Sequence, residues 1–180
     1  MTAKSIMSTN VAVLKPDDTV ATALQMMRDR EVHNLPVLDD AGYFIGLFSL
    51  RRFSRELLPK AAKLDEHSLQ MHINFMPDST DELHDRLIEI GKQPVSAILE
   101  KPSKLRFCKP ETPLPELLVL LSENPTSLPV VVIEGEKKKL AGMVSNWDVL
   151  ARLAVNLLSS NNMLTDSSPS DQQPYTIENK

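Results

Sequence analysis

The sequence predicts a mixed α/β fold in which one unit of strand–helix–strand–strand–helix occurs twice. Three landmarks support this prediction, because each occurs twice, in the same order and 93–96 residues apart. They are a proline-acid start at 16–20 and 110–114, Leu-Pro-Val at 35–37 and 128–130, and Gly-x-x-Ser at 46–49 and 142–145. Each copy spans roughly 55 residues, a size at which folding buries only about 60% of the chain's surface. The two copies are therefore expected to pack together, with a cleft between them that suits a small ligand.

Short apolar runs and one helical stripe define the first copy, which we place at 1–58. The run at 11–14 ends at Lys15-Pro16 and predicts a strand, since proline and the residue before it disfavour helix. Apolar residues then recur at helical spacing, and Asp17 or Asp18 is the expected N-cap. The elements expected in order are a strand at 11–14, a helix at 19–30, strands at 35–38 and 43–48 joined by a turn, and a closing helix that Ser49 caps.

The second copy, which we place at 94–158, repeats this order. Its expected elements are a strand at 105–108, a helix at 114–121, strands at 128–133 and 140–144 joined by a charged turn, and a closing helix that begins at Ser145.

An insert at 59–93 separates the copies, and a tail follows them at 159–180. Within the insert, Ser79 and Glu82 form a capping-box pattern just before an apolar stripe, which predicts one extra helix at 81–91. The tail is rich in Ser, Asn, Asp, Gln and Pro, so we expect it to be disordered.

Composition and charge exclude several classes of function. The hydrophobic fraction of 42% suffices for a core, but no run approaches the roughly 20 apolar residues of a membrane helix, and the start lacks the apolar run of a secretory signal. The formal net charge of −4 argues against a nucleic-acid partner, which selects a basic face. The single cysteine permits no internal disulfide. We therefore expect a cytoplasmic protein with no nucleic-acid or membrane partner.

The sequence contains no motif of a known catalytic site. It has no Gly-rich phosphate loop, no nucleophile elbow and no His-Glu-x-x-His helix. His67 and His72 lie five residues apart in the insert, whereas metal sites need a tighter and more complete set of ligands. We therefore expect no enzymatic activity, no bound metal and no obligatory cofactor.

The ordered set of landmarks, present twice, resembles the tandem repeats of the CBS (cystathionine-β-synthase) domain family, a pair also called a Bateman module. The lead-in at 5–10, Ser-Ile-Met-Ser-Thr-Asn, is similar to the segment before the family's first strand. The resemblance covers about 5–58 and 94–155. It implies a pseudo-twofold, disc-like pair that binds an adenosyl ligand (AMP, ADP, ATP or S-adenosylmethionine), regulates a partner protein and commonly forms a homodimer. The apolar helix faces expected at the dimer interface are those of Leu24 and Met27 or of Leu117 and Leu121, together with those of the closing helices.

Ser145 and Asp148 are the residues best suited to hold such a ligand. The resemblance implies that both face the nucleoside and that the carboxylate accepts from the two ribose hydroxyls. Independently, a serine at a helix N-terminus lies beside free N–H groups that favour phosphate, and an aspartate three residues later shares its face. An ionised carboxylate only accepts hydrogen bonds, so a vicinal diol with two donors matches it. The alternative is that Ser145 only caps the helix and Asp148 only favours its positive end.

Further candidate residues come from both copies. If an adenosyl ligand binds, we expect its adenine to lie beside the second copy, against Leu105 and Arg106 and against Pro129 and Val130. His33 precedes the Leu-Pro-Val of the first copy. It is either close enough to the cleft to reach a phosphate or an ordinary surface histidine.

The first copy departs from the family pattern, because Arg52 stands where the second copy has Asp148. A guanidinium cannot accept from hydroxyls but pairs well with phosphate. Three interpretations remain open. The first site is inactive, or Arg51 or Arg52 holds the phosphates of a ligand seated on the second copy, or both arginines belong to a solvated helix start.

Two functional hypotheses follow. The first is a stand-alone regulatory module that binds an adenosyl ligand in the cleft between the repeats and signals to a separate partner protein. The second is a dimerisation and interaction scaffold with a vestigial nucleotide site, which the lost carboxylate at Arg52 and the long insert favour.

Overall fold

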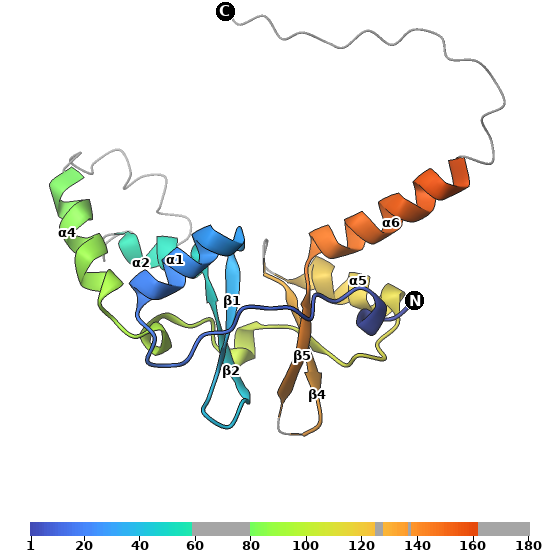
Figure 1. Cartoon of the computed structure of the whole chain (residues 1–180), viewed down its shortest axis with the longest axis horizontal. Helices are drawn as coiled ribbons and strands as arrows, with labels where there is room; N and C mark the ends of the chain where they lie inside the picture. Colours follow the sequence, from blue (N-terminus) through green and yellow to red (C-terminus); the bar gives the residue numbers. More distant parts are fainter. Residues whose placement is uncertain (59–79, 125–127, 137, 162–180) are drawn as a thin grey trace, which may run out of the picture.

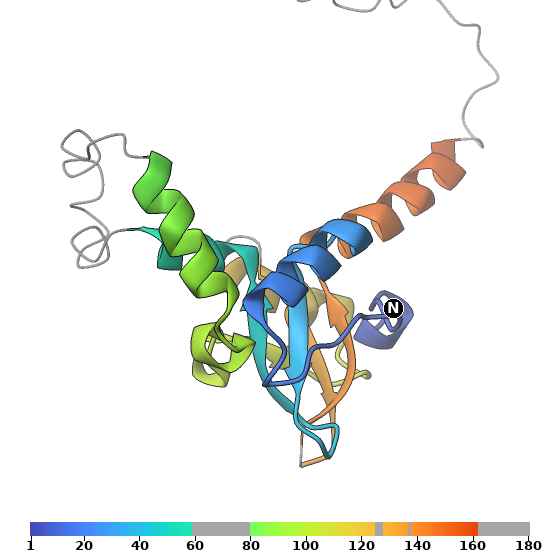
Figure 2. The same ribbon diagram turned by 60° about the vertical axis from the view of Figure 1, so that its left-hand side comes forward.

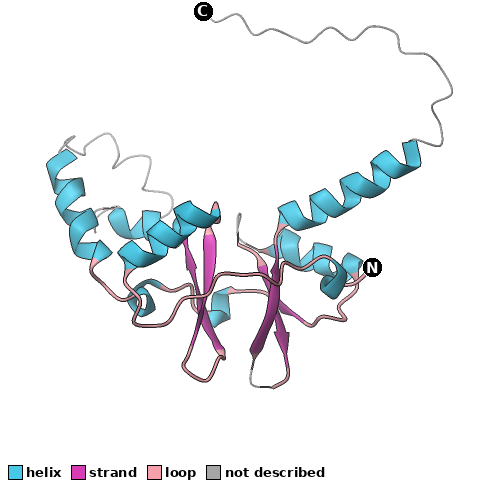
Figure 3. Cartoon of the chain, viewed as in Figure 1, coloured by secondary structure: helices cyan, strands magenta, loops and turns pink. Residues whose placement is uncertain are grey.

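Two β-hairpins stand side by side at the centre of the molecule, and each carries one copy of the repeat (Figure 3). The computed structural model describes residues 1–58, 80–124, 128–136 and 138–161. It confirms the mixed α/β fold. The first copy contains α1 (Val20–Arg30), β1 (Asn34–Leu38), β2 (Phe44–Ser49) and α2 (Leu50–Leu57). The second contains β3 (Phe107–Cys108), α5 (Leu114–Glu123), β4 (Val130–Glu134), β5 (Lys139–Val144) and α6 (Asn146–Asn161).

The remaining described elements are short, apart from one helix. The insert supplies α4 (Thr80–Gly91), which agrees with the helix expected at 81–91. Three 3₁₀ turns, η1 (Ala3–Ser5), η3 (Val95–Ile98) and η4 (Pro102–Lys104), lie in the segments that lead into the two copies. Ser79 and the rest of 59–79 lie outside the described residues, as does the expected tail beyond Asn161. Residues 159–161, expected to belong to the tail, form the end of α6.

Both hairpins are antiparallel, and β3 pairs with β4 in parallel. The strand expected at 11–14 is reduced to a single bridge, in which Leu14 pairs with Val37. The helix after it starts one residue later than expected, because its N-cap is Thr19, whose hydroxyl accepts from the Thr22 N–H at 3.1 Å. The expectation of Asp17 or Asp18 as the N-cap is therefore wrong. The Asp18 carboxylate accepts from the Lys15 N–H at 2.7 Å and closes the turn before the helix.

The segments that lead into the copies are exchanged between them. Ser8 pairs with Met143 of β5 through two backbone hydrogen bonds of 2.9 and 3.1 Å, although Ser8 belongs to the first copy. Glu100 leads into the second copy but pairs with Leu47 of β2, at 2.8 and 3.3 Å. In Figure 1 the leading segment, drawn in dark blue, starts beside the second copy and crosses to α1 of the first. Each hairpin is therefore flanked by the other copy's chain.

The glycine of each Gly-x-x-Ser landmark makes room for this exchange. A Cβ on Gly142 would lie 2.8 Å from the backbone oxygen of Ser8. A Cβ on Gly46 would lie 2.9 Å from Leu99 Cδ1 and 3.2 Å from the backbone oxygen of Glu100. Any other side chain at these positions would push the crossing segment away from the hairpin.

A core shared by both copies joins the two hairpins. Phe44 and Leu47 of the first copy cluster with Leu105, Leu128 and Val131 of the second, and all five are buried. The ring of Phe44 also meets that of Phe107 edge-on, with centroids 5.8 Å apart. A further core lies beneath the helices of each copy, and the other copy's leading segment contributes to it, with Val95 and Ile98 in the first copy and Ala3 in the second.

The helices lie on the outer flanks, and the two copies differ in what covers them. In the first copy α4 packs against α1 and α2. In the second copy α6 projects away from the body of the molecule (Figures 1 and 2). Of the expected interface residues, Met27, Leu117 and Leu121 are buried in the chain's own cores. Leu24 is partly buried and packs against the core of the first copy. Up to Val155, the last residue of α6 whose exposure is described, the large apolar side chains exposed on α5 and α6 are Leu118, Val119, Trp147, Leu150 and Val155. Among the described residues, no helix is long and apolar enough to cross a membrane.

Gly142→Ala and Gly46→Ala should each lower the free energy of unfolding by about 1–3 kcal/mol, because the new methyl group overpacks against the exchanged segment. Chemical denaturation of the purified proteins measures this. Gly91→Ala is the control, since its Cβ would meet only Ala21 Cβ at 3.8 Å. Equal stability of all three variants would contradict the close approach.

Candidate functional site

A cavity of about 590 Å³ lies between the two copies. The exchanged segment at 8–12 supplies one wall, and residues 30–35, from the end of α1 into β1, supply another. The second copy closes the cavity with Pro129, Met143 and the start of α6. Its volume lies within the range of small-molecule sites, roughly 300–1,000 Å³. Since neither copy alone supplies all of these walls, the cavity exists only in the pair.

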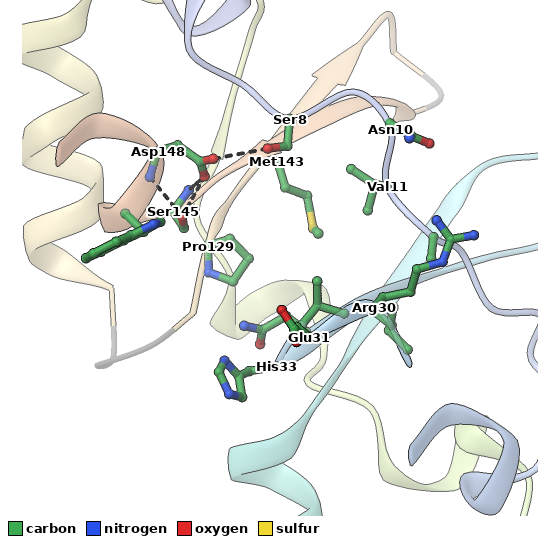
Figure 4. Close-up of a pocket in the computed structure, with 15 residues that line it drawn as sticks. Ser8, Asn10, Val11, Arg30, Glu31, His33, Pro129, Met143, Ser145 and Asp148 are labelled. Atoms are coloured by element: carbon green, nitrogen blue, oxygen red, sulfur yellow. Dashed lines mark hydrogen bonds between the residues drawn. The ribbon is translucent and has the colours of Figure 1, made fainter. Parts of the chain in front are cut away.

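Asp148 accepts hydrogen bonds from both copies at one end of this cavity (Figure 4). Its Oδ2 accepts from the Ser145 N–H at 2.7 Å and from the Ser145 hydroxyl. Its Oδ1 accepts from the Ser8 hydroxyl at 3.0 Å. In return the Asp148 N–H donates to Ser145 Oγ at 3.2 Å. Ser145 and Asp148 thus cap α6 reciprocally, as a capping box does, while facing the cavity. The helix cap expected as the alternative to ligand binding is therefore present. Ser145 and Asp148 nevertheless both line the cavity.

Charged groups of both signs also line the cavity away from Asp148. In Figure 4 the guanidinium of Arg30 lies on the opposite side of the view from Asp148, and Glu31 and His33 lie nearer Pro129. Glu31 is the C-cap of α1 and has a left-handed backbone, with φ of 55°. This conformation ends the helix and turns the chain towards β1.

The structure brings together four of the eight candidate ligand residues. Those that line the cavity are Ser145, Asp148, Pro129 and His33. The other four candidates, Val130, Leu105, Arg106 and Arg52, are not among the residues that line it.

The candidates outside the cavity have other contacts. Val130 and Leu105 are buried in the apolar cores. Arg106 lies 3.5 Å from Glu123, with both side chains partly exposed.

Arg52 occupies the counterpart of the Asp148 position at the start of α2. Ser49 is buried there and caps α2 by accepting from the Arg52 N–H at 3.0 Å. The Arg52 guanidinium forms an ion pair with Glu56 at 3.0 Å, one turn further along the helix. A serine hydroxyl therefore caps each closing helix, but only the second copy adds the return bond to a carboxylate.

Several residues that line the cavity were not predicted from the sequence, and most of them belong to the first copy. They are Ser8, Asn10, Val11, Ala12, Arg30, Glu31, Val32, Asn34, Leu35, Met143 and Trp147. The repeat pattern places the first strand of the second copy, with Leu105 and Arg106, beside Ser145. The exchange instead places the segment at 8–12 there. Gly46 and Gly142 are the one feature of the sequence that indicates a close approach of another segment to the hairpins.

Cys108 lies outside this cavity and is suited to packing rather than to chemistry. Burial raises the pKa of its thiol to about 11, an effect that the hydrogen bond to Thr112 partly offsets and that nearby Glu116 reinforces. The thiol is therefore neutral at physiological pH and a poor nucleophile. Within the described ranges, no group of three or more His, Cys, Asp or Glu side chains is arranged to hold a metal ion, whereas His67 and His72 lie outside those ranges.

Comparison with known families gives two matches along the chain. The family model of the CBS domain matches residues 3–59 and again residues 95–155, together about two thirds of the length. No curated protein sequence matches the chain.

Solved structures share the fold over most of the chain. The CBS-pair protein CBSX2 from Arabidopsis thaliana aligns with a TM-score of 0.63 and 21% identity, over 88% of this chain and 96% of its own. CBSX2 in complex with AMP gives 0.60 and 21%, over 87% and 98%. The CBS domain pair of protein MJ0100, in complex with 5′-methylthioadenosine and S-adenosyl-L-methionine, gives 0.60 and 12%, over 87% and 98%.

Ser49→Ala and Ser145→Ala should each lower the free energy of unfolding by about 1 kcal/mol, because each removes the side-chain acceptor that caps a helix. Urea denaturation measures both. Ser54→Ala is the control, since its hydroxyl donates to the Leu50 carbonyl inside α2 and caps nothing. A stability unchanged by Ser145→Ala would contradict the cap on α6.

Proposed function

The chain belongs to the CBS domain family, and we propose that it is a regulatory module that binds an adenosyl ligand in the cavity between its two copies. In this proposal the module is not an enzyme, and occupancy of the cavity is signalled to a separate effector protein. The candidate ligands are AMP, ADP, ATP and S-adenosylmethionine.

The observation that carries the proposal is a carboxylate, Asp148, at the end of a cavity that both copies build. A carboxylate accepts two hydrogen bonds from a vicinal diol, which the ribose of every adenosyl ligand offers. Small apolar groups of Val11, Ala12, Val32 and Pro129 line the cavity as well and suit the flat faces of a base. The proteins of similar fold that hold AMP, 5′-methylthioadenosine or S-adenosyl-L-methionine support this class of ligand.

We assign the contact with a phosphate or carboxylate of the ligand to Arg30 and His33. Both line the cavity, whereas Arg52 is paired with Glu56. Under this assignment Arg52 belongs to the architecture of α2, and the first-copy site is inactive towards nucleosides because it lacks an acceptor for the diol.

The alternative function, a dimerisation scaffold with a vestigial site, is favoured by a different observation. The reciprocal cap of Ser145 and Asp148 is complete without any ligand. Both residues would therefore be needed for the start of α6 even if nothing ever bound. A binding measurement separates the two functions, since only the regulatory module takes up the ligand.

Asp148→Asn should weaken AMP binding by about 10- to 150-fold, because one ribose hydroxyl loses a charged acceptor and meets a donor instead. Trp147 is the only tryptophan of the chain, and its side chain is 74% exposed at the cavity, so its fluorescence should report binding. Titrations of AMP, ADP, ATP and S-adenosylmethionine would also rank the ligands.

Two matched variants control this titration. Ser145→Ala should weaken AMP binding, whereas Ser49→Ala removes the equivalent cap in the first copy and should leave the affinity unchanged. Wild-type affinity in Asp148→Asn, with the fold intact by circular dichroism, would remove this cavity as the ligand site and leave the scaffold ahead.

We further propose that the protein is a homodimer whose interface lies on α5 and α6. Leu118, Val119, Leu150 and Val155 are exposed on these helices, while α4 covers the equivalent helices of the first copy. A second chain placed around a twofold axis would cover both sets of side chains at once.

Light scattering at micromolar concentration should give about twice the chain mass of 20.1 kDa. Val119→Glu should reduce this to the mass of one chain, because an unpaired charge would be buried at the interface. Leu83→Glu on α4 is the control, since Leu83 is similarly exposed and lies away from α5 and α6. A monomeric mass for the unmodified chain would refute the dimer.

A further inference from the structure

We propose that the hydroxyl of Ser8 competes with the ribose for Asp148, so that Ser8 sets the affinity of the cavity for ligands that carry a ribose diol. This inference rests on the proposed function, since it concerns the same carboxylate. It assigns a role to Ser8, which lies 140 positions from Asp148 in the sequence and belongs to the other copy.

The hydrogen-bonding capacity of Asp148 is nearly used up in the ligand-free chain. A carboxylate offers about four lone-pair positions, two on each oxygen. The N–H and hydroxyl of Ser145 take both positions on Oδ2, and Ser8 takes one on Oδ1. One position remains, whereas a vicinal diol brings two donors. The diol can therefore bind fully only if one serine hydroxyl leaves.

Ser8 is the donor that leaves most easily. Ser145 holds Asp148 through two donors and accepts in return from the Asp148 N–H, so its departure would undo the cap of α6. Ser8 holds Asp148 through one hydroxyl, and its side chain is exposed. Once released, that hydroxyl can bond to water at little cost.

Release of the hydroxyl need not displace the Ser8 backbone. Ser8 remains paired with Met143 through two hydrogen bonds, and Gly142 leaves room for that pairing. The exchange is therefore local: one ribose hydroxyl replaces one serine hydroxyl on Oδ1, and the wall at 8–12 stays in place for the base. A ligand without the diol leaves the bond between Ser8 and Asp148 undisturbed.

Ser8→Ala should therefore bind AMP about 3- to 10-fold more tightly than the unmodified chain, since no internal donor has to leave. It should bind 2′,3′-dideoxy-AMP with unchanged affinity. Both titrations can follow the Trp147 fluorescence or use calorimetry. Ser8→Thr keeps a hydroxyl and should restore the original AMP affinity. Ser5→Ala is the control in the same segment, because its hydroxyl donates to the Thr2 carbonyl at 2.7 Å and not to Asp148.

The outcomes separate this inference from the proposed function. Weaker or unchanged AMP binding in Ser8→Ala, or an equal gain for the dideoxy ligand, would overturn the competition while leaving the ligand site in place. If the unmodified chain bound no adenosyl ligand at all, the proposed function itself would fail, and the competition with it.

Discussion

The exchange of leading segments between the two copies is the constraint on which the rest of the structure depends. Ser8 is bound to β5 of the second copy, and Glu100 to β2 of the first. Each crossing requires a hairpin residue without a side chain, which Gly142 and Gly46 provide. Because of the exchange, the chain at 8–12 becomes a wall of the space between the copies, and the copies cannot separate without breaking hydrogen bonds in both hairpins. The shared core around Phe44 and Leu105 then fixes their relative orientation.

Within this symmetric frame, one substitution makes the two ends of the pair chemically different. Ser49 and Ser145 play the same structural part, since each hydroxyl accepts from the N–H three residues later. At that later position the first copy has Arg52 and the second has Asp148. The arginine turns along α2 to pair with Glu56, whereas the aspartate folds back on its own cap and reaches across to Ser8. The equivalent position therefore carries a paired cation in the first copy and a carboxylate acceptor in the second, so the two ends of the pair differ in chemistry.

The sequence predicted the elements well because the helices and strands are determined by local patterns. The apolar stripe that ends at Met27 suffices to define α1. The run of β-branched residues suffices to define β4. The sequence also pointed to Ser145 and Asp148, because a serine and an aspartate three residues apart at a helix start share one face. It also pointed to Leu105 and Arg106 as neighbours of the adenine, and neither lies in the wall of the cavity. Contacts such as that of Ser8 with Asp148 join distant positions, and no local preference encodes them.

The hydrogen bonds that Asp148 accepts within the chain also limit how much this residue could add to the affinity for a ligand. Because its oxygens already accept three hydrogen bonds, a diol that bound there would add one bond at the remaining position and replace the bond from Ser8. The replaced bond would change the free energy little, so the diol would contribute mainly through the one hydrogen bond that it adds. The favourable free energy must then come mainly from apolar surface buried against Val11, Pro129 and Met143, at about 25 cal/mol per Å². Under the proposed function, apolar contacts from both copies would supply most of the affinity, and Asp148 would supply the preference for a ribose diol. A change that loosens the crossing at Gly142 should therefore weaken every ligand alike, whereas a change at Asp148 should weaken those that carry the diol.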